Sequence, residues 1–216
     1  MLNVSGLSKS YGGKVALDHV SFTLAQSEVM AVVGDNGAGK STLLSVLAAE
    51  TVPDTGDVLL FGKSIFKHKR HSASKVAYVP QGIALNMNLT TMDTLRFWAA
   101  VSKLDAPARK AAYARLITLL GLQPFLKTKI KCLSVGVARR VNIAAALFSS
   151  PALLLMDEPT AGLDHTSRTA LIEFIAKLPA DGTSVIFVTH IRDDLEMLNL
   201  GDKLKILRLH EGRQKP

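Results

Sequence analysis

Apolar residues follow two alternating patterns along the chain: short runs typical of strands, and longer segments with apolar residues at helical spacing. The short runs predict strands over residues 15–24, 28–33, 57–61, 76–79, 152–156 and 185–188. Helical spacing predicts helices after residue 39, over 91–104, after Asp105, over 137–148 and over 166–178. The first strand mixes polar and apolar residues, whereas residues 30–33, 152–156 and 185–188 are apolar runs. The pattern therefore predicts an α/β fold with a mixed, mainly parallel sheet and an N-terminal antiparallel β region.

The middle of the chain is mostly helical. Asp105, with Pro107 after it, predicts a helix start, and Gly121 predicts the end of that helix. We expect three apolar helix faces, formed by Met92, Leu95, Trp98 and Val101, by Ala108, Ala112, Leu116 and Leu119, and by Val137, Val141, Ala145 and Phe148. The expected organisation is one domain over residues 1–216, with a core of 1–81 and 151–216 and an inserted α-helical subdomain at about 82–150.

Three of the predicted strands run directly into polar residues. The strand that ends at Val33 leads into a glycine-rich loop, the one that ends at Met156 into Asp157-Glu158, and the one that ends at Val188 into Thr189-His190. Ligands of open α/β sheets bind at the carboxyl ends of the strands. The three polar groups are therefore candidates for one shared site.

The glycine-rich loop has the spacing of a phosphate-binding loop. Its glycines allow a sharp turn with inward N–H groups, and the following helix adds unpaired N–H groups and a positive dipole end. Lys40 supplies a charge for the β- and γ-phosphates, and Ser41 supplies a hydroxyl for Mg²⁺. The sequence therefore predicts a P-loop NTPase core that binds a nucleoside triphosphate through Gly34, Asp35, Asn36, Gly37, Ala38, Gly39, Lys40, Ser41 and Thr42.

The acidic pair Asp157-Glu158 fits the same chemistry. An aspartate at the tip of a buried strand beside a phosphate loop can hold Mg²⁺ or its water. Glu158 points to the other side of an extended chain and can polarise an attacking water as a general base. The alternative is that both acids are turn or N-cap residues, as often follows a strand. The phosphate loop favours the catalytic reading.

The charge of the chain is concentrated in its middle. The formal net charge is +8, but residues 63–140 hold 15 Lys and Arg against two acids, Asp93 and Asp105. The remaining residues hold 11 basic and 16 acidic side chains. A basic middle suits nucleic acid, an anionic membrane surface or phosphate-bearing ligands, and a solvated helix surface is the alternative.

The composition excludes several classes of protein. Hydrophobic residues make up 48% of the chain and charged residues 20%, which is enough for a buried core and unlike a disordered tail. The sequence has no stretch of 18 or more residues that is free of charged and turn residues, so a membrane span is not predicted. The first nine residues lack the apolar region of a secretory signal. Cys132 is the single cysteine, so we expect a reducing, cytosolic compartment.

At these motifs the chain resembles the ATP-binding subunit of ABC transporters, and the order of motifs matches from end to end. Tyr11, in Leu7-Ser8-Lys9-Ser10-Tyr11-Gly12, is similar to the aromatic residue that stacks on adenine. Gln81, in Tyr78-Val79-Pro80-Gln81, is similar to the family glutamine that binds Mg²⁺ and senses the membrane domains. Asp164, in Ala161-Gly162-Leu163-Asp164, resembles the D-loop, and His190 resembles the switch histidine at the γ-phosphate.

The family signature Leu-Ser-Gly-Gly-Gln is altered here to Leu133-Ser134-Val135-Gly136-Val137. Ser134 and Gly136 keep a hydroxyl and a glycine N–H that can reach a γ-phosphate. If the position of Val135 requires a positive φ, valine is strongly disfavoured, whereas in a helix it costs little. Val137 replaces a polar side chain near the nucleotide, so the resemblance supports ATP binding more firmly than hydrolysis.

The resemblance implies a complex of several subunits or domains. Two such domains meet head to tail, with each ATP between the phosphate loop of one and the signature of the other. Glu158 activates water, His190 orients it, Ser41, Gln81 and Asp157 hold Mg²⁺, and transmembrane permease subunits carry the substrate. The subunit is expected at the cytoplasmic face of a membrane, with an anionic membrane surface beside its basic helices and no nucleic acid.

Residues 139–144, together with Ala84-Leu85 and Leu89-Thr90 after Gln81, are most similar to ABC-2 type exporters. The transport of a substrate, and its export, is therefore the expected function. Two alternatives stay open: a nucleotide-gated regulatory module with weak hydrolysis because of the altered signature, and a soluble ABC ATPase that acts on nucleic acid.

Overall fold

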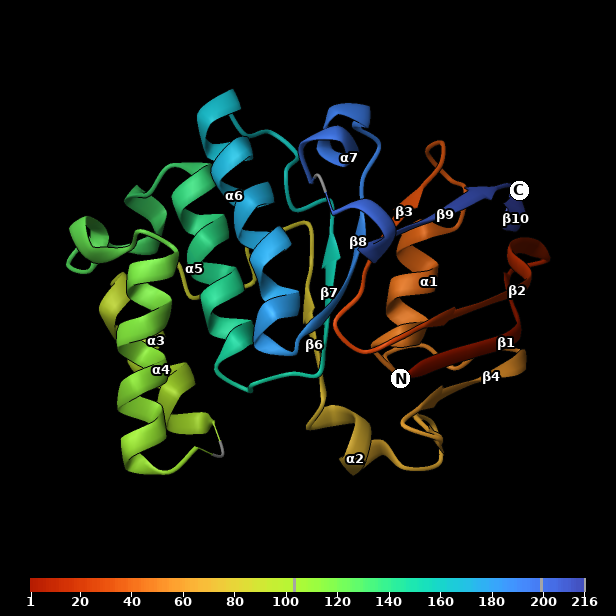
Figure 1. Cartoon of the computed structure of the whole chain (residues 1–216), viewed down its shortest axis with the longest axis horizontal. Coiled ribbons are helices and arrows are strands. Elements are labelled where there is room, and N and C mark those ends of the chain that lie inside the picture. Colours follow the sequence, from red (N-terminus) through yellow and green to blue (C-terminus); the bar gives the residue numbers. More distant parts are fainter. Residues whose placement is uncertain (103, 199, 216) are drawn as a thin grey trace.

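The computed structural model of the chain describes residues 1–102, 104–198 and 200–215. A six-stranded sheet forms the centre, with most of the helices on one side of it and α1 with a smaller sheet on the other (Figure 1). The helical part of the chain and the small antiparallel sheet lie at opposite ends of the molecule, and both termini lie at the antiparallel end.

The central sheet has the strand order β10-β9-β3-β8-β7-β6. All of its neighbouring strands are parallel except β10, which pairs antiparallel with β9. Asp157 pairs with Val188, and Val188 pairs with Val32, so three strands end at the same level. The strands are β3 (Val29–Val33), β6 (Val76–Val79), β7 (Leu153–Asp157), β8 (Ser184–Val188), β9 (Leu204–His210) and β10 (Arg213–Lys215).

The second sheet is antiparallel, with the order β2-β1-β4-β5. Its long strands are joined by the turn Gly12-Gly13, and Tyr11 pairs with Lys14 across that turn. The strands are β1 (Leu2–Tyr11), β2 (Lys14–Leu24), β4 (Thr55–Leu60) and β5 (Lys63–Ser64).

Helices fill two hydrophobic cores, one on each face of the central sheet. Successive residues of a strand point to opposite faces, so Leu153 and Leu155 pack towards α1 and the antiparallel sheet, while Leu154 and Met156 pack towards the other helices. The helices are α1 (Lys40–Leu47), α2 (Lys69–Ala73), α3 (Thr91–Val101), α4 (Ala106–Leu119), α5 (Val135–Leu147), α6 (His165–Lys177) and α7 (Arg192–Leu198). Four short 3₁₀ turns cover Gln123–Phe125, Ile130–Cys132, Leu178–Asp181 and Gly201–Lys203.

The predicted α/β fold, with a mainly parallel mixed sheet and an antiparallel β region, is confirmed. No range was predicted for the strands β1, β5, β9 and β10 or for the helices α2 and α7. Helix α3 ends at Val101 rather than at residue 104, with residue 103 outside the described part. Asp105 caps α4 as expected, because its Oδ1 accepts a hydrogen bond of 2.8 Å from Ala108 N.

Two of the three predicted helix faces were partly wrong. Trp98 and Val101 on α3, and Ala108 and Leu119 on α4, are exposed. On α3 the expected row runs in steps of three, each of which rotates the side chain by about 60°, so the row leaves the buried side of the helix. The expected rows of α4 and α5 both run in steps of four, four and three. Their difference therefore comes from packing, because α4 buries only Leu116 and Ile117 near its C-terminal end. The face of α5, built on steps of three and four residues, is buried over its whole length.

Of the helices in the described part of the chain, none combines the length and the apolar character that crossing a bilayer requires.

Candidate nucleotide-binding site

The level ends of β3, β7 and β8 bring the predicted site together. A cavity of about 570 Å³ opens at this edge of the sheet. Ten of the predicted residues line it: Tyr11, Asn36, Gly37, Gly39, Lys40, Ser41, Thr42, Gln81, Glu158 and His190. Gly34 and Asp35 line a neighbouring cavity of about 630 Å³, and Ala38 is buried beneath the loop. The cavity therefore joins the phosphate loop to the acidic and histidine motifs.

The sharp turn from β3 into α1 requires glycine. Gly39, the N-cap of α1, has φ +97°, in the left-handed region that residues with a Cβ rarely adopt. A Cβ at this position would lie 2.2 Å from the carbonyl oxygen of Ala16. The close approach of β2 to the loop thus depends on the missing side chain, and it leaves the N–H groups of α1 facing the cavity.

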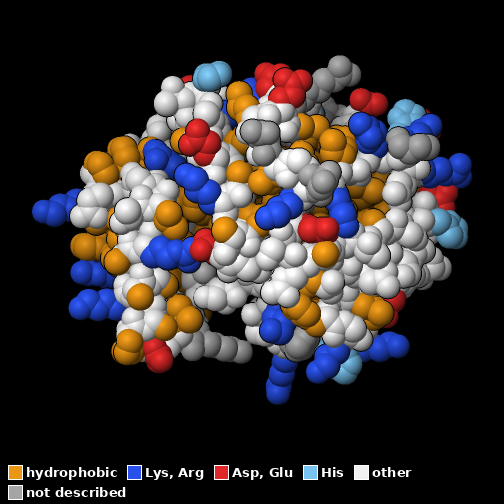
Figure 2. Space-filling view, viewed as in Figure 1, with side chains coloured by type: hydrophobic (Ala, Val, Ile, Leu, Met, Phe, Trp, Pro, Cys, Tyr) orange, Lys and Arg blue, Asp and Glu red, His pale blue; other side chains and the backbone are white. Residues whose placement is uncertain are grey.

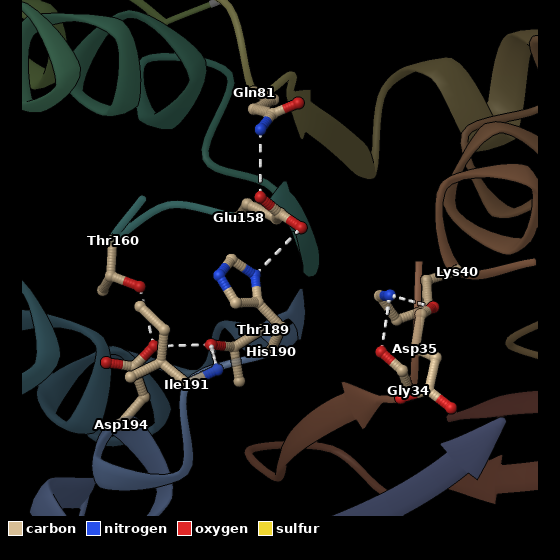
Figure 3. Close-up of polar contacts among 10 residues, drawn as sticks. All are labelled: Gly34, Asp35, Lys40, Gln81, Glu158, Thr160, Thr189, His190, Ile191 and Asp194. Atoms are coloured by element: carbon tan, nitrogen blue, oxygen red, sulfur yellow. Dashed lines mark hydrogen bonds and ion pairs between the residues drawn. The ribbon is translucent and has the colours of Figure 1, made fainter. Parts of the chain in front are cut away.

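Lys40 is the first residue of α1 and is only 6% exposed. Its Nζ donates hydrogen bonds of 2.7 Å to Gly34 O and 2.8 Å to Asp35 O, the carbonyls of its own loop (Figure 3). These contacts hold the ammonium group over the loop. A phosphate at the cavity would meet this charge together with the N–H groups of the helix start.

Asp157 ends β7 beneath the cavity and is only 7% exposed. Burial raises the pKa of its carboxyl group, and the charge of Glu158 adds to this, while a hydrogen bond from Ser41 and the charges of Lys40 and Arg139 act in the opposite direction. The negative charge at Asp157 is therefore only partly compensated, which favours a cation beside it.

These residues fit Mg²⁺. The carboxylate of Asp157, the hydroxyl of Ser41 and the amide oxygen of Gln81 are hard oxygen donors, which Mg²⁺ prefers together with substrate phosphates. Among the described residues, no three His, Cys, Asp or Glu side chains form a metal cluster. The protein alone offers too few ligands for a closed metal site, so phosphate oxygens would have to complete the coordination.

Glu158 is held from two sides. Gln81 Nε2 donates a hydrogen bond of 2.9 Å to one carboxylate oxygen, and His190 Nδ1 lies 3.2 Å from the other (Figure 3). The backbone of Glu158 has φ +45°, an unfavourable conformation for a residue with a side chain. Such strain is typical of functional positions. Three motifs from three separate segments thus meet at one carboxylate.

Tyr11 lies at the end of β1 with half of its surface exposed. Lys9 Nζ lies 5.5 Å from the centre of the Tyr11 ring and pairs with Asp54 at 2.7 Å. Asp54 also accepts a hydrogen bond of 2.7 Å from Ser10 N. Lys9 therefore occupies one side of the ring, anchored by Asp54, and the ring itself lines the cavity. The sequence did not indicate these two positioning residues.

A buried network that the sequence analysis missed fixes the loops around Glu158 and His190. Asp194 is fully buried and accepts hydrogen bonds of 2.7 Å from Thr160 Oγ1, 2.6 Å from Thr189 Oγ1 and 2.6 Å from Arg168 Nε. Thr189 directly precedes His190, and Thr160 follows Glu158 by two residues (Figure 3). The only sequence signal was an acid four residues after His190.

The signature residues lie away from the cavity. Ser134 is the N-cap of α5, with its Oγ accepting a hydrogen bond of 3.4 Å from Val137 N, and it is exposed. Gly136 is buried, and a Cβ there would lie 3.1 Å from Ser167 Oγ on α6. Asp164 caps α6, where hydrogen bonds from Ser167 lower the pKa of its carboxyl group. None of the three is among the residues that line the cavity.

The structure settles the question about Val135. It is the first residue of α5, it does not have a positive φ, and it is 55% exposed. Valine therefore introduces no backbone strain into the signature. Val137 is buried in the hydrophobic core between the sheet and the helices, rather than exposed at a nucleotide surface.

Comparisons with known proteins agree with this geometry. The family described as "ABC transporter" matches residues 17–161. A second description, "AAA domain, putative AbiEii toxin, Type IV TA system", matches residues 133–192, which include the acidic pair and the histidine. The chain belongs to the ABC transporter family of ATP-binding proteins, and it is an ABC ATPase in family and fold.

Two curated relatives are exporter or resistance proteins by name. The chain is 37% identical to the "Linearmycin resistance ATP-binding protein LnrL" of Bacillus subtilis over 92% of its own length and 64% of that protein. It is 32% identical to the "Nod factor export ATP-binding protein I" of Rhizobium leguminosarum bv. viciae over 98% of its length and 69% of that protein. The chain thus spans about two thirds of the length of these relatives.

Solved structures share the whole fold. The "Structure of ATP binding subunit of ABC transporter" aligns with a TM-score of 0.87 at 28% identity, covering 100% of this chain and 88% of that chain. CbiO1 from Clostridium perfringens, described as part of an ABC transporter complex, aligns with a TM-score of 0.87 at 26% identity, covering 100% of this chain and 86% of that chain.

The substitution Asp157→Asn tests whether the partly compensated negative charge of Asp157 destabilises the fold. Because burial raises the pKa of Asp157, its ionised form destabilises the fold above the folded-state pKa, and this loss disappears below the unfolded value of about 3.9. Without nucleotide, we expect the variant to have a higher melting temperature than wild type at pH 8. The increase should be roughly 2–4 °C for each 1 kcal/mol by which the free energy of unfolding rises, and it should become smaller as the pH falls. The variant should lose the stabilisation that Mg²⁺-ATP gives wild type.

The matched control is Asp105→Asn, at an exposed N-cap where asparagine caps equally well. It should change neither the melting temperature nor the response to Mg²⁺-ATP. A nucleotide-free Asp157→Asn protein that melts below wild type at pH 8 contradicts the charge argument.

Proposed function

We propose that the chain binds Mg²⁺-ATP and hydrolyses it, and that hydrolysis powers export through separate transmembrane subunits. This proposal rests on one cavity that is shared by the phosphate loop and the other predicted motifs. Lys40 and Ser41 line one side of it, and Gln81, Glu158 and His190 line the other. A phosphate bound at the loop would lie opposite a carboxylate and an imidazole, which is the arrangement that phosphoryl transfer to water requires.

The proposed roles follow from the geometry. Tyr11 stacks on the base, the residues of the loop from Gly34 to Thr42 bind the phosphates, and Lys40 contacts the β- and γ-phosphates. Ser41, Asp157 and Gln81 hold Mg²⁺, which when bound neutralises charge on the phosphate oxygens.

The reaction is an attack of water on the γ-phosphorus. Glu158 accepts a proton as the new phosphorus–oxygen bond forms, and the bond to the bridging oxygen breaks to give ADP and phosphate. His190 orients the γ-phosphate and the water. Gln81 and His190 each contact one carboxylate oxygen of Glu158, and the remaining acceptor sites of the two oxygens can bind water.

A second ATP-binding domain is part of the proposal. Ser134 and Gly136 lie at the start of α5 and outside the cavity of their own chain, and Ser134 is exposed. They can contact a γ-phosphate only when another cassette presents one, with Asp164 at the same contact. We therefore propose a head-to-tail dimer, homomeric or heteromeric, in which the helical residues 82–150 act as a subdomain beside the core.

Transport is supported by the relatives, two of which carry export or resistance in their names. In this role the chain sits at the cytoplasmic face of a membrane and acts on permease subunits. A regulatory module with weak hydrolysis was the main alternative, and its chief support was strain at Val135, which the helical conformation removes.

Glu158→Gln is the test of catalysis. The amide keeps the shape of the side chain and its contacts but cannot accept a proton, so ATP turnover should fall by roughly 10²–10⁴-fold. Binding of Mg²⁺-ATP should stay within a few fold, measured by equilibrium titration, and sedimentation should show more dimer than for wild type because hydrolysis no longer reopens it. Turnover equal to that of wild type would remove Glu158 from the proposed catalytic role.

The basic part of the chain suggests how the subunit approaches a membrane. Lys and Arg side chains project along the edge formed by α3 and α4 (Figure 2). Arg139 and Arg140 bind backbone carbonyls inside the molecule, so the surface charge is lower than the sequence count. Exposed basic residues among residues 63–140 are Lys63, Lys67, Lys69, Arg70, Arg96, Lys110, Arg115, Lys127, Lys129 and Lys131, of which Arg115 pairs with Asp181. We propose that they face an anionic lipid surface.

Charge reversal tests this contact. Wild type should bind anionic vesicles and not neutral ones, with affinity that falls as salt rises. Lys110→Glu with Lys127→Glu should weaken binding roughly 10- to 30-fold, since each basic residue contributes about 1 kcal/mol. The control pair, Lys203→Glu with Lys215→Glu, lies outside the basic part and should change binding less. Equal sedimentation with neutral and anionic vesicles would rule the contact out.

A further inference from the structure

Arg139 is a buried cation that the catalytic account leaves unused. It lies on the second turn of α5 and is only 4% exposed. A buried arginine needs partners to offset its lost hydration, and Arg139 finds them in backbone carbonyls. Its Nη1 donates hydrogen bonds to Pro80 O at 3.1 Å and to Gln81 O, while its Nε is buried without a partner.

A second side chain of the same helix continues the contact. Asn142 is buried and its Nδ2 donates a hydrogen bond of 3.4 Å to Gly82 O. Helix α5 therefore binds three successive carbonyls, those of residues 80, 81 and 82, which follow the end of β6. These are long-range contacts between segments about sixty residues apart in the chain.

The residue held in this way is the one that reaches the catalytic carboxylate. The backbone of Gln81 is bound to α5, and its side-chain amide donates to Glu158 at 2.9 Å (Figure 3). The same helix begins at Ser134, which caps its N-terminus. Gln81 thus joins the helix that carries the signature to the carboxylate at the end of β7.

We propose that Arg139 is a positioning residue, in the ATPase reaction proposed above, that fixes the backbone of Gln81 to α5 so that Gln81 and Ser134 move as one unit relative to Glu158. Arginine suits this position because its Nη1 carries two N–H donors at the end of a long side chain, so one nitrogen can donate to both carbonyls, whereas a shorter or apolar side chain cannot. Without Arg139, the 3.4 Å contact from Asn142 to Gly82 O would be the one that remains of the three hydrogen bonds described above between α5 and this segment.

The chain contains a built-in reporter of this segment. Trp98 is the single tryptophan and is 38% exposed. It lines a cavity of about 320 Å³ together with Pro80, Ala84 and Asn142. Movement of the segment away from α5 should therefore change the access of a quencher to the Trp98 indole.

The test compares two neighbouring arginines of α5 in the full-length chain. Arg139→Met removes the donors but keeps an unbranched side chain. Arg140→Met is the matched control, because Arg140 also donates to a backbone carbonyl, that of Leu120 at 2.9 Å, away from Gln81. Acrylamide quenching of Trp98 is measured without nucleotide and with Mg²⁺-ATP, beside the affinity for ATP with and without Mg²⁺.

We expect the nucleotide-free quenching constant to rise about twofold in Arg139→Met and to stay at the wild-type value in Arg140→Met. In Arg139→Met, Mg²⁺-ATP should no longer shift the quenching, and the gain in ATP affinity from Mg²⁺ should shrink, while affinity without Mg²⁺ stays near wild type because the phosphate loop is untouched. Wild-type quenching in a folded Arg139→Met protein would overturn the proposed role, as would an equal rise in both variants.

If Arg139→Met does not melt cooperatively, Arg139→Gln replaces it. Its shorter amide cannot span both carbonyls, so the same rise in quenching is expected, and wild-type quenching would overturn the role. The nucleotide-free comparison does not depend on the proposed ATPase function. Wild-type protein that fails to bind Mg²⁺-ATP would contradict that function, whereas the quenching of the two arginine variants would still decide whether Arg139 anchors Gln81.

Discussion

The in-register parallel pairing of β3, β8 and β7 is the constraint on which the rest of the molecule depends. Because Val32, Val188 and Asp157 lie at one level, the segments that follow the three strands must meet at one edge. Hydrophobic burial on both faces of the sheet holds this register, since a slip of one residue would exchange the side chains of the two cores. A rigid apolar sheet thus positions a charged and partly strained site.

Glu158 is where the separate parts of the protein meet. Gln81 donates a hydrogen bond to Glu158 and is itself bound to α5 through its backbone carbonyl. His190, in the loop after β8, contacts the other carboxylate oxygen of Glu158. The buried Asp194 ties the backbones around both loops to α6 through Thr160, Thr189 and Arg168. A change at any of these contacts reaches the same carboxylate, which gives a physical route between the signature helix and the proposed chemistry.

The sequence predicted what is local and missed what is not. The phosphate loop, the acidic pair and His190 could be found because each directly follows an apolar strand, and parallel strands align their ends. Lys9, Arg139 and Asp194 could not, because Lys9 and Arg139 bind residues far away in the chain, and Asp194 binds Thr160 and Arg168 as well as the nearby Thr189. The expected face of α3 was wrong because its residues were counted in steps of three. The faces of α4 and α5 were counted with the same steps, and α5 is buried along its length because it packs against α3, α4, α6 and β6.

The edge of the sheet beside Lys40 is the proposed binding site for ATP with Mg²⁺. Calorimetric titration of ATP into the wild-type chain and into Lys40→Met, each in the presence of Mg²⁺, tests it most directly. The account predicts saturable one-to-one binding by wild type and a roughly 10- to 150-fold weaker affinity for the variant, since charged hydrogen bonds contribute about 1.5–3 kcal/mol each. No binding by wild type, or equal affinity of the two proteins, would contradict it.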